Sequence, residues 1–335
     1  DSFYTMEENL IIMDEIRKIY TKSLKNTLFN PVNISDFIEY DGNLVPIYEV
    51  SDEFQMLIQS TATSYGGMPI INNNYFDSWN LSSRTSNHGI CCSLISNSNM
   101  GMASVSGNGI VIGFNSFADN QINMMAPYDL YTYNDQYNIR SARPMLFLPG
   151  EEVINQTRHT HNEFNLERVN LEENSKYANI QPDYVVWFED MDETLKNNAF
   201  KASLEFEIPL VYVNKEKIAK MECQKIDQYI SDYQTTGNLE NILQALLLHE
   251  NNRSGYRISN QELISQYFPT EKIDTLFRTA ISNSNTLEQL EFIKQILLNE
   301  QQKFDITYEA TDRINVIDLP IEEYIQLLDD KISSL

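Results

Sequence analysis

The 335-residue sequence is poor in the residues that mark several large classes of protein. Its 11 glycines and 10 prolines are too few for a collagen-like or low-complexity chain. The three cysteines, Cys91, Cys92 and Cys223, are too few for a disulfide framework, so we expect a reducing compartment. The apolar runs fall far short of the ~18 residues that cross a bilayer, so no membrane span is expected.

Basic residues are also scarce. The chain has 24 lysines and arginines against 48 aspartates and glutamates, which gives a net charge of −24. A surface this acidic repels phosphate backbones, so nucleic acid is not an expected partner. With 42% apolar and 21% charged residues, the composition is that of a globular protein.

Hydrophobic spacing divides the chain into a mixed front and a helical remainder. An amphipathic helix is expected over 5–26, and Ser51 followed by two acidic residues predicts a helix from 52 to about 62. Residues 66–87 are expected to form a loop. Strands are predicted at 89–95, 101–106, 110–114, 145–148, 184–188 and 209–213, with a helix at 192–202. Helices are predicted at 215–233, 238–250, 259–267, 270–281, 286–303 and 320–333.

This pattern predicts an α+β fold, with a mainly antiparallel sheet core, an N-terminal helix and a C-terminal helical domain. We expect an N-terminal helical region at 1–80, a sheet-containing catalytic core at 81–214 and a helical domain at 215–335.

The positive charges of the predicted core are unusual. No lysine occurs between Lys25 and Lys176, yet five of the ten arginines lie there. They are Arg84, Arg140, Arg143, Arg158 and Arg168. A guanidinium binds phosphate or carboxylate through two parallel hydrogen bonds and is always charged. The alternative is ordinary ion pairing in an acidic protein.

Two of only four histidines fall in the segment Arg158-His159-Thr160-His161-Asn162-Glu163. On a strand, His159, His161 and Glu163 point to one face; on a helix, His159 and Glu163 lie one turn apart. In both cases Glu163 can fix the tautomer of a neighbouring imidazole and raise its basicity. A cupin-like metal site is the second interpretation, although the glycine spacing is wrong for it, and a polar edge strand is the third.

His159 and Glu163 form a His-x-x-x-Glu pattern, and Ser116 in Gly113-Phe114-Asn115-Ser116 precedes it by 43 residues. This constellation resembles the S-HxxxE motif of bacterial effector AMP-transferases, the LnaB-like family. The resemblance covers about residues 84–190. It implies an enzyme secreted by a bacterium into the host cytoplasm and activated by a host protein, actin. It also implies transfer of AMP from ATP to a phosphoryl or protein acceptor.

The resemblance also implies roles for three residues. His159 would be the catalytic base or a hydrogen-bond donor to phosphate, Glu163 its orienting partner, and Ser116 a phosphate contact. We infer that Arg84, Arg143 and Arg158 bind the triphosphate, because charge builds up on the leaving pyrophosphate. Candidates for holding Mg²⁺ are Asp183, Glu189, Asp190 and Asp192. No Walker sequence is present, so ATP would be bound without a P-loop.

Two alternatives stay open. The first is a similarity to the start of the SidE-type phosphodiesterases, which act on phosphoribosyl-linked substrates; it rests on the segment Arg84-Thr85-Ser86-Asn87-His88-Gly89. Where that family has its second histidine, this sequence has cysteines. A non-catalytic module that binds a host protein is the other alternative, with the apolar cluster at 243–248 as a groove helix. Because actin is acidic too, its contact would rest on apolar residues of the N- or C-terminal helices and depend weakly on salt.

Overall fold

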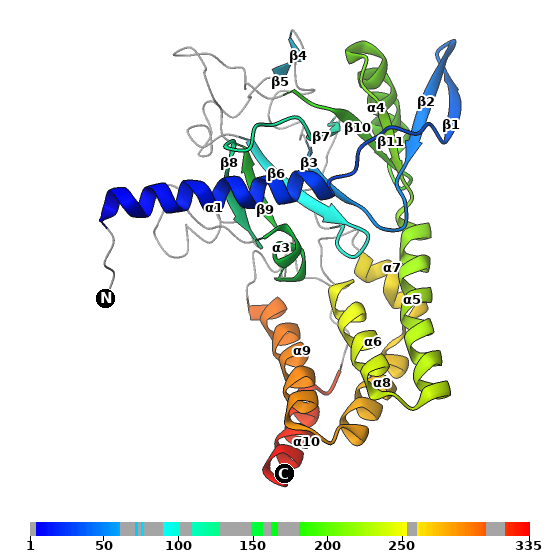
Figure 1. The fold of residues 1–335 in the computed structure, drawn as a ribbon. Coiled ribbons are helices and arrows are strands. Elements are labelled where there is room, and N and C mark those ends of the chain that lie inside the picture. The colour runs from blue at the N-terminus through cyan, green and yellow to red at the C-terminus, as the bar shows by residue number, and fades with distance from the viewer. Residues whose placement is uncertain are drawn as a thin grey trace. The chain divides into compact units, whose positions relative to one another are not determined.

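The computed structural model describes residues 5–60, 71–72, 75–76, 90–100, 109–127, 149–156, 162–166, 181–252, 260–305 and 319–335. Their helices are α1 (Met6–Thr27), α3 (Gly150–Gln156), α4 (Glu193–Phe206), α5 (Lys215–Thr236), α6 (Leu239–Asn251), α7 (Asn260–Tyr267), α8 (Thr270–Asn283), α9 (Leu287–Asp305) and α10 (Ile321–Ser333). The chain forms two compact units (Figure 1). The first contains the sheet and lies within residues 1–214. The second consists mainly of residues 215–335 and includes the turn that begins at Asn97.

A nine-stranded sheet organises the first unit, in the order β1-β2-β11-β10-β7-β3-β6-β9-β8. Its strands are β1 (Asp36–Tyr40), β2 (Asn43–Glu49), β3 (Gln55–Ser60), β6 (Ile90–Ser96), β7 (Val111–Gly113), β8 (Ile122–Ala126), β9 (Glu163–Leu166), β10 (Tyr184–Phe188) and β11 (Leu210–Val213). All neighbours pair antiparallel except β10 with β11 and β11 with β2, which are parallel. The predicted α+β fold, with its antiparallel sheet, N-terminal helix and C-terminal helices, is therefore confirmed.

Local sequence signals explain several of these elements. Thr5 and Glu8 form a capping box at the start of α1, where each side chain bonds the other residue's backbone N–H. Asp41 and Gly42 have positive φ angles of 48° and 75° in the turn that joins β1 to β2. An Asp-Gly pair favours this turn because both residues tolerate positive φ. Asp192 caps α4, the helix that connects the parallel strands β10 and β11.

The helix predicted over 52–62 is wrong, because residues 55–60 form β3. The hydroxyl of Ser51 donates to the carbonyl oxygen of Glu53 instead of accepting from a backbone N–H, so it stabilises a turn. Met56, Leu57 and Ile58 are completely buried on both faces of the sheet, as expected of a central strand. Within the loop predicted over 66–87, Ile71–Asn72 (β4) and Tyr75–Phe76 (β5) pair as a short ladder. The strands predicted over 101–106 and 145–148 lie outside the described residues.

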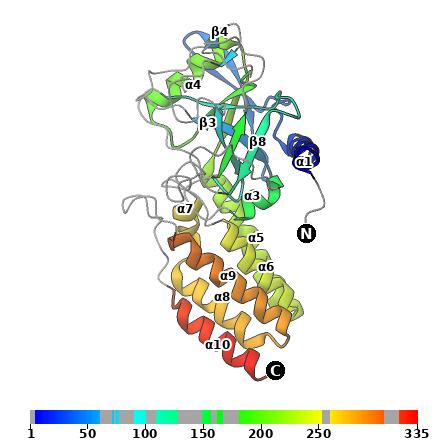
Figure 2. The same cartoon turned by 90° about the vertical axis from the view of Figure 1, so that its left-hand side faces the viewer.

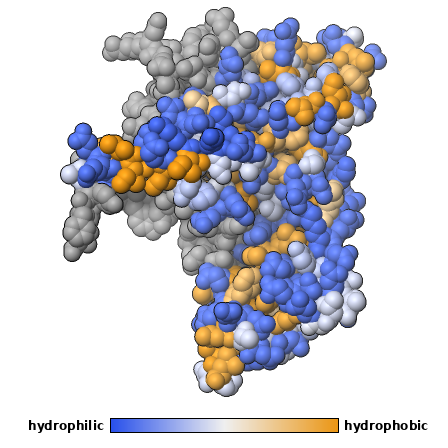
Figure 3. All heavy atoms as spheres, viewed as in Figure 1, coloured by the Kyte–Doolittle hydropathy of each residue, from blue (hydrophilic) through white to orange (hydrophobic). Residues whose placement is uncertain are grey.

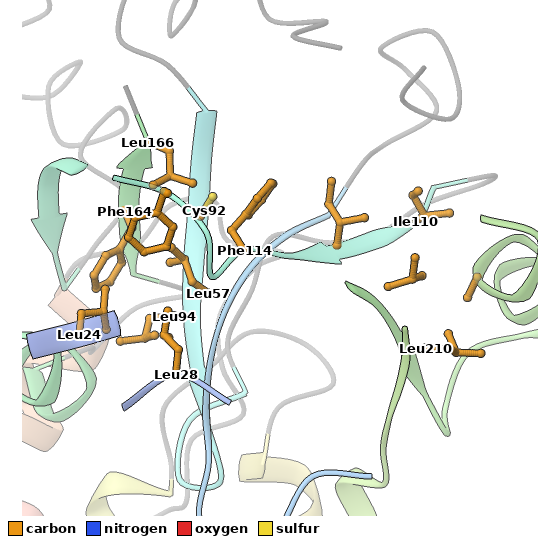
Figure 4. Close-up of a cluster of buried hydrophobic side chains, with 14 of the residues drawn as sticks. Leu24, Leu28, Leu57, Cys92, Leu94, Ile110, Phe114, Phe164, Leu166 and Leu210 are labelled. Atoms are coloured by element: carbon orange, nitrogen blue, oxygen red, sulfur yellow. The ribbon is translucent and has the colours of Figure 1, made fainter. Parts of the chain in front are cut away.

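One face of the sheet packs against helices, and we call it the helix face. Leu24 of α1 and Phe200 of α4 share a buried cluster with Leu57, Leu94 and Phe164 from the strands. Figure 4 shows Phe164 and Leu166 of β9 beside Leu57, Cys92 and Leu94 in this cluster. Because strand side chains alternate, the residue next to each of these strand residues points to the other side, which we call the opposite face.

The second unit is a bundle with its own apolar core. That core combines residues of α5, α6, α7, α8, α9 and α10, including Leu246, Phe277 and Tyr324. In Figure 2, α8, α9 and α10 lie side by side. The helices predicted from 215 onward match those observed to within about three residues at the ends that the structure describes. The N-cap predicted at Asn238 is confirmed, because its side chain accepts from the N–H of Glu240.

Two further observations concern surfaces. In Figure 3 an apolar surface lies along part of α1. Leu10, Ile11 and Ile19 of this helix are each more than half exposed. Among the described residues, no helix has the length and apolar character needed to cross a membrane.

Candidate functional site

Glu163 is the first residue of β9, and the sheet register fixes its neighbours. Phe164 belongs to the helix-face cluster, so Glu163 points to the opposite face. Cys92 pairs with Phe164, and continuing this ladder by one step sets Ser93 against Glu163. Ile58 lies opposite both Ser93 and Gly113, and Gly113 lies opposite Tyr184. One row on the opposite face therefore runs Glu163–Ser93–Ile58–Gly113–Tyr184 across five strands.

Asn162 holds Glu163 in this register. Its side-chain oxygen accepts from the N–H of Leu94 at 2.7 Å, and its side-chain nitrogen donates to the carbonyl oxygen of Leu94 at 2.8 Å. The amide thus takes the place of a backbone pair and extends the β6–β9 ladder by one residue. Asn162 is completely buried and Glu163 is 5% exposed, so both side chains belong to the interior.

Ser116 lies beyond the end of β7 and is bound to Asp183, which precedes β10. The carboxylate of Asp183 accepts from the N–H of Asn115, from the N–H of Ser116 at 2.9 Å and from the hydroxyl of Ser116. The N–H of Asp183 donates to the carbonyl oxygen of Gly113 at 2.8 Å. Because the Ser116 hydroxyl donates to Asp183, its oxygen presents lone pairs to solvent. Contact with a phosphate oxygen would require the hydroxyl to rotate away from Asp183.

Tyr184 lies over Gly113, where only glycine leaves room for it. A Cβ atom on Gly113 would lie 2.0 Å from Cε2 of Tyr184 and 2.6 Å from its hydroxyl oxygen. The side chain thus crosses from β10 over β7 in the direction of β3 and β6. Burial raises the pKa of the Tyr184 hydroxyl, and the negative charge of Asp183 raises it further. The hydroxyl therefore keeps its proton and can donate.

The two described residues of the S-HxxxE pattern lie at one end of the sheet. Successive antiparallel pairings of β7, β3, β6 and β9 mean that β9 begins at the end where β7 finishes. Three inter-strand steps separate Gly113 from Glu163, which is about 14 Å at 4.7–4.9 Å per step. The hydrogen bonds of Ser116 go to Asp183 and not to Glu163. A ligand that touches both Ser116 and Glu163 must therefore be an extended molecule.

The other predicted site residues, His159, Arg84, Arg143 and Arg158, lie outside the described residues, as do His88 and His161. Two of the Mg²⁺ candidates have structural roles, since Asp183 binds the end of β7 and Asp192 caps α4. No group of three or more potential metal ligands occurs in the described part of the chain.

Cys92 and Cys223, the two cysteines whose side chains the structure describes, are unsuited to nucleophilic chemistry. Burial raises the pKa of the Cys92 thiol, and the charge of Glu163 raises it further. Burial also raises the pKa of Cys223 to about 12. Both thiols stay protonated near neutral pH, whereas a reactive cysteine needs the thiolate.

Sequence reasoning missed three residues that shape this end of the sheet. They are Asn115, Tyr184 and Asn162, and the side-chain amide of Asn162 sets the register of β9 against β6. Asp183 was considered only as a metal ligand, and its actual partner lies 67 residues away in the chain. The glycine at 113, placed in the apolar run before Asn115, is the one local signal that a bulky group approaches β7.

Searches of protein-family models, curated proteins and solved structures find no match to this chain.

Proposed function

We propose that this protein transfers AMP from ATP to a phosphoryl or protein acceptor, as its resemblance to the LnaB-like family implies. The observation that carries the proposal is the common location of Ser116 and Glu163. They are far apart in sequence, yet they lie at one end of one sheet, because β9 begins where β7 ends. Their separation of three strands suits an extended ligand such as a nucleoside triphosphate.

The proposed reaction assigns roles to the predicted site residues. An oxygen of the acceptor attacks the α-phosphorus of ATP, the bond to the bridging oxygen of the β-phosphate breaks, and pyrophosphate leaves. His159 takes the proton of the acceptor or donates a hydrogen bond to the phosphate, and Glu163 orients its imidazole. Arg84, Arg143 and Arg158 balance the charge that builds up on the pyrophosphate, and Mg²⁺ would be an additional cation there.

The position of Glu163 supports its role as an orienting residue. It is 5% exposed and stands at the start of a strand whose register Asn162 secures through two hydrogen bonds. Burial and a fixed strand register limit the positions open to this carboxylate, which favours the fixing of an imidazole tautomer. A side chain on a solvated edge strand would have no such constraint.

Host actin is the proposed activator, and α1 carries the described apolar surface that suits it best. Leu10, Ile11 and Ile19 are exposed on this helix, and an apolar contact does not depend on charge attraction between two acidic proteins. The acceptor would be a phosphorylated or phosphoribosylated host protein.

Incubation with ATP labelled in its α-phosphate, with and without a host-cell extract, tests the proposal. We expect labelled AMP on an acceptor together with released pyrophosphate. His159→Ala should abolish both products, and His161→Ala should have a smaller effect. If the wild-type protein forms neither product under either condition, the transferase proposal fails. The SidE-type alternative predicts instead cleavage of a phosphoribosyl-linked substrate that depends on His88.

A further inference from the structure

The helix α1 carries a second apolar face besides the one that packs against the sheet. Its residue Leu24 belongs to the buried core, with 2% exposed surface. Ile12, Ile16 and Ile19 lie on another side of the helix, at spacings of four and three residues, and we call them the isoleucine stripe. They are 40%, 38% and 62% exposed, and Figure 3 shows apolar surface along part of this helix. This spacing is that of the seam between two paired helices.

The charges of α1 are divided between its two halves. All its acidic residues precede Ile16 and all its basic residues follow it. The acidic residues are Glu7, Glu8, Asp14 and Glu15, and the basic residues are Arg17, Lys18, Lys22 and Lys25. The helix dipole accounts for charges in the first and last turns. Pairing within the helix accounts for Asp14, which binds Arg17 at 2.6 Å and Lys18 at 3.0 Å. Neither reason accounts for Lys22, which is exposed and lies more than one turn from the end of the helix.

We propose that two copies of this chain associate through α1, with the two helices antiparallel and their isoleucine stripes in contact. Antiparallel pairing sets the acidic half of each helix against the basic half of the other, so α1 is complementary to itself. A two-fold symmetric dimer needs this property, because both copies contribute the same surface. Parallel pairing would instead set like charges together. The inference does not depend on the proposed reaction.

Contact between Ile16 of one copy and Ile19 of the other gives the register that the charges favour. Glu15 of one copy then lies level with residue 20 of the other, two residues from Lys22. Glu15 and Lys22 are seven residues apart, so both flank the stripe on the same side, and symmetry forms their opposite-charge pair twice. The register with Ile12 level with Ile16 would bring the two Glu15 side chains together instead.

The dimer should be weak, because one pair of helices makes a small interface. Interfaces below about 1,200 Å² are typical of transient complexes. The net charge of −24 on each copy opposes association, but in about 0.15 M salt charges more than about 8 Å apart are largely screened. We therefore expect a dissociation constant on the order of 10–100 μM at this salt concentration. The pairing concerns the protein free of actin, whose proposed contact also includes Ile19.

Sedimentation equilibrium of the full chain in about 0.15 M salt tests the pairing through two charge reversals. Glu15→Lys and Lys22→Glu each turn both opposite-charge pairs into like-charge pairs, so each variant alone should self-associate about 10-fold more weakly than the wild type. A mixture of the two variants restores both pairs, so the variants should bind each other about as tightly as the wild type binds itself. Their melting temperatures should stay close to that of the wild type, because both residues are exposed.

Two further variants serve as controls. Glu216→Lys changes the net charge as Glu15→Lys does, but on an exposed residue of α5, so it should not weaken self-association. Ile16→Ser interrupts the isoleucine stripe and should abolish self-association while the protein stays folded, because Ile16 is exposed.

The inference is overturned if the wild type stays monomeric at about 1 mM, well above the expected dissociation constant. It is also overturned if the mixture of Glu15→Lys and Lys22→Glu associates no more tightly than either variant alone. If Glu216→Lys weakens association as much as Glu15→Lys does, overall charge and not α1 governs it, and the pairing is wrong. Self-association that survives Ile16→Ser would place the interface elsewhere on the molecule and overturn the inference as well.

Discussion

Replacing Gly113 by alanine is the sharpest test of the packing at the centre of the sheet. The added Cβ would lie 2.0 Å from Cε2 of Tyr184, whereas carbon atoms in contact are ordinarily about 3.5–4.0 Å apart. The ring would have to move by about 1.5 Å, the difference between these distances. Tyr184 has no exposed surface, so the ring has no solvent to move into. Overpacking of this kind costs about 1–3 kcal/mol.

Thermal unfolding followed by circular dichroism measures this cost. For a unit of about 200 residues, 1 kcal/mol shifts the melting temperature by about 2–4 °C, so we expect a loss of about 2–12 °C. In a Tyr184→Ala background the same change should cost much less, because the ring that it meets is gone. Gly42→Ala is the control, since Gly42 has a positive φ of 75° and no atom within 4 Å of an added Cβ. Its cost should come from the backbone alone and be independent of residue 184. A wild-type melting temperature for Gly113→Ala, or an equal cost in both backgrounds, would refute the packing described.

Three further predictions concern other parts of the molecule. Asn162→Ala should destabilise the sheet unit by about 2–4 kcal/mol in urea unfolding, because it leaves two buried backbone groups of Leu94 unbonded; unchanged stability would contradict the register at β9. Tyr324→Phe should cost about 1 kcal/mol at pH 7, since the Tyr324 hydroxyl is the main cause of the lowered pKa of Asp274. Because the pKa of Asp274 is lower in the folded state, its bond with Tyr324 stabilises the protein above the unfolded pKa of about 3.9, and this stabilisation is lost as pH falls through the folded-state pKa. The stabilities of wild type and variant should therefore converge in acid, and a constant difference down to about pH 2 would refute this. Finally, binding of actin should depend weakly on salt and fall when Ile11 and Ile19 are both changed to serine; a steep loss of binding with rising salt would indicate a basic partner surface instead.

The sequence predicted best those elements that carry a strong local signal. The strand predicted over 184–188 and the helix predicted at 192–202 are both observed, as Tyr184–Phe188 and Glu193–Phe206. The apolar run of the first favours a strand, and Asp192 proves to be the N-cap of the second. The helix predicted over 52–62 was wrong because Ser51 followed by two acidic residues resembles a helix start. Burial of this segment on both faces of the sheet makes it a strand instead. The β1–β2 hairpin was not predicted, although Asp41-Gly42 is a recognisable turn signal.

The site was harder to predict, because its geometry comes from pairings between distant segments. That Glu163 lies on a strand was one of two alternatives, and periodicity alone does not choose between them. Which residues share its row depends on the register of β3, β6, β7 and β10, and local patterns do not encode register. The contact of Ser116 with Asp183 and the fit of Tyr184 over Gly113 depend on the same pairings.

The central claim is tested most directly by measuring the rate at which the Glu163→Gln variant and the wild type release pyrophosphate from ATP in the presence of host-cell extract. If Glu163 orients the catalytic imidazole, the variant should lose about 10²–10⁴ in rate and keep its melting temperature. Glu250→Gln, a change of another buried glutamate in the helical unit, should leave the rate unchanged. A folded Glu163→Gln variant that releases pyrophosphate at the wild-type rate would contradict the account.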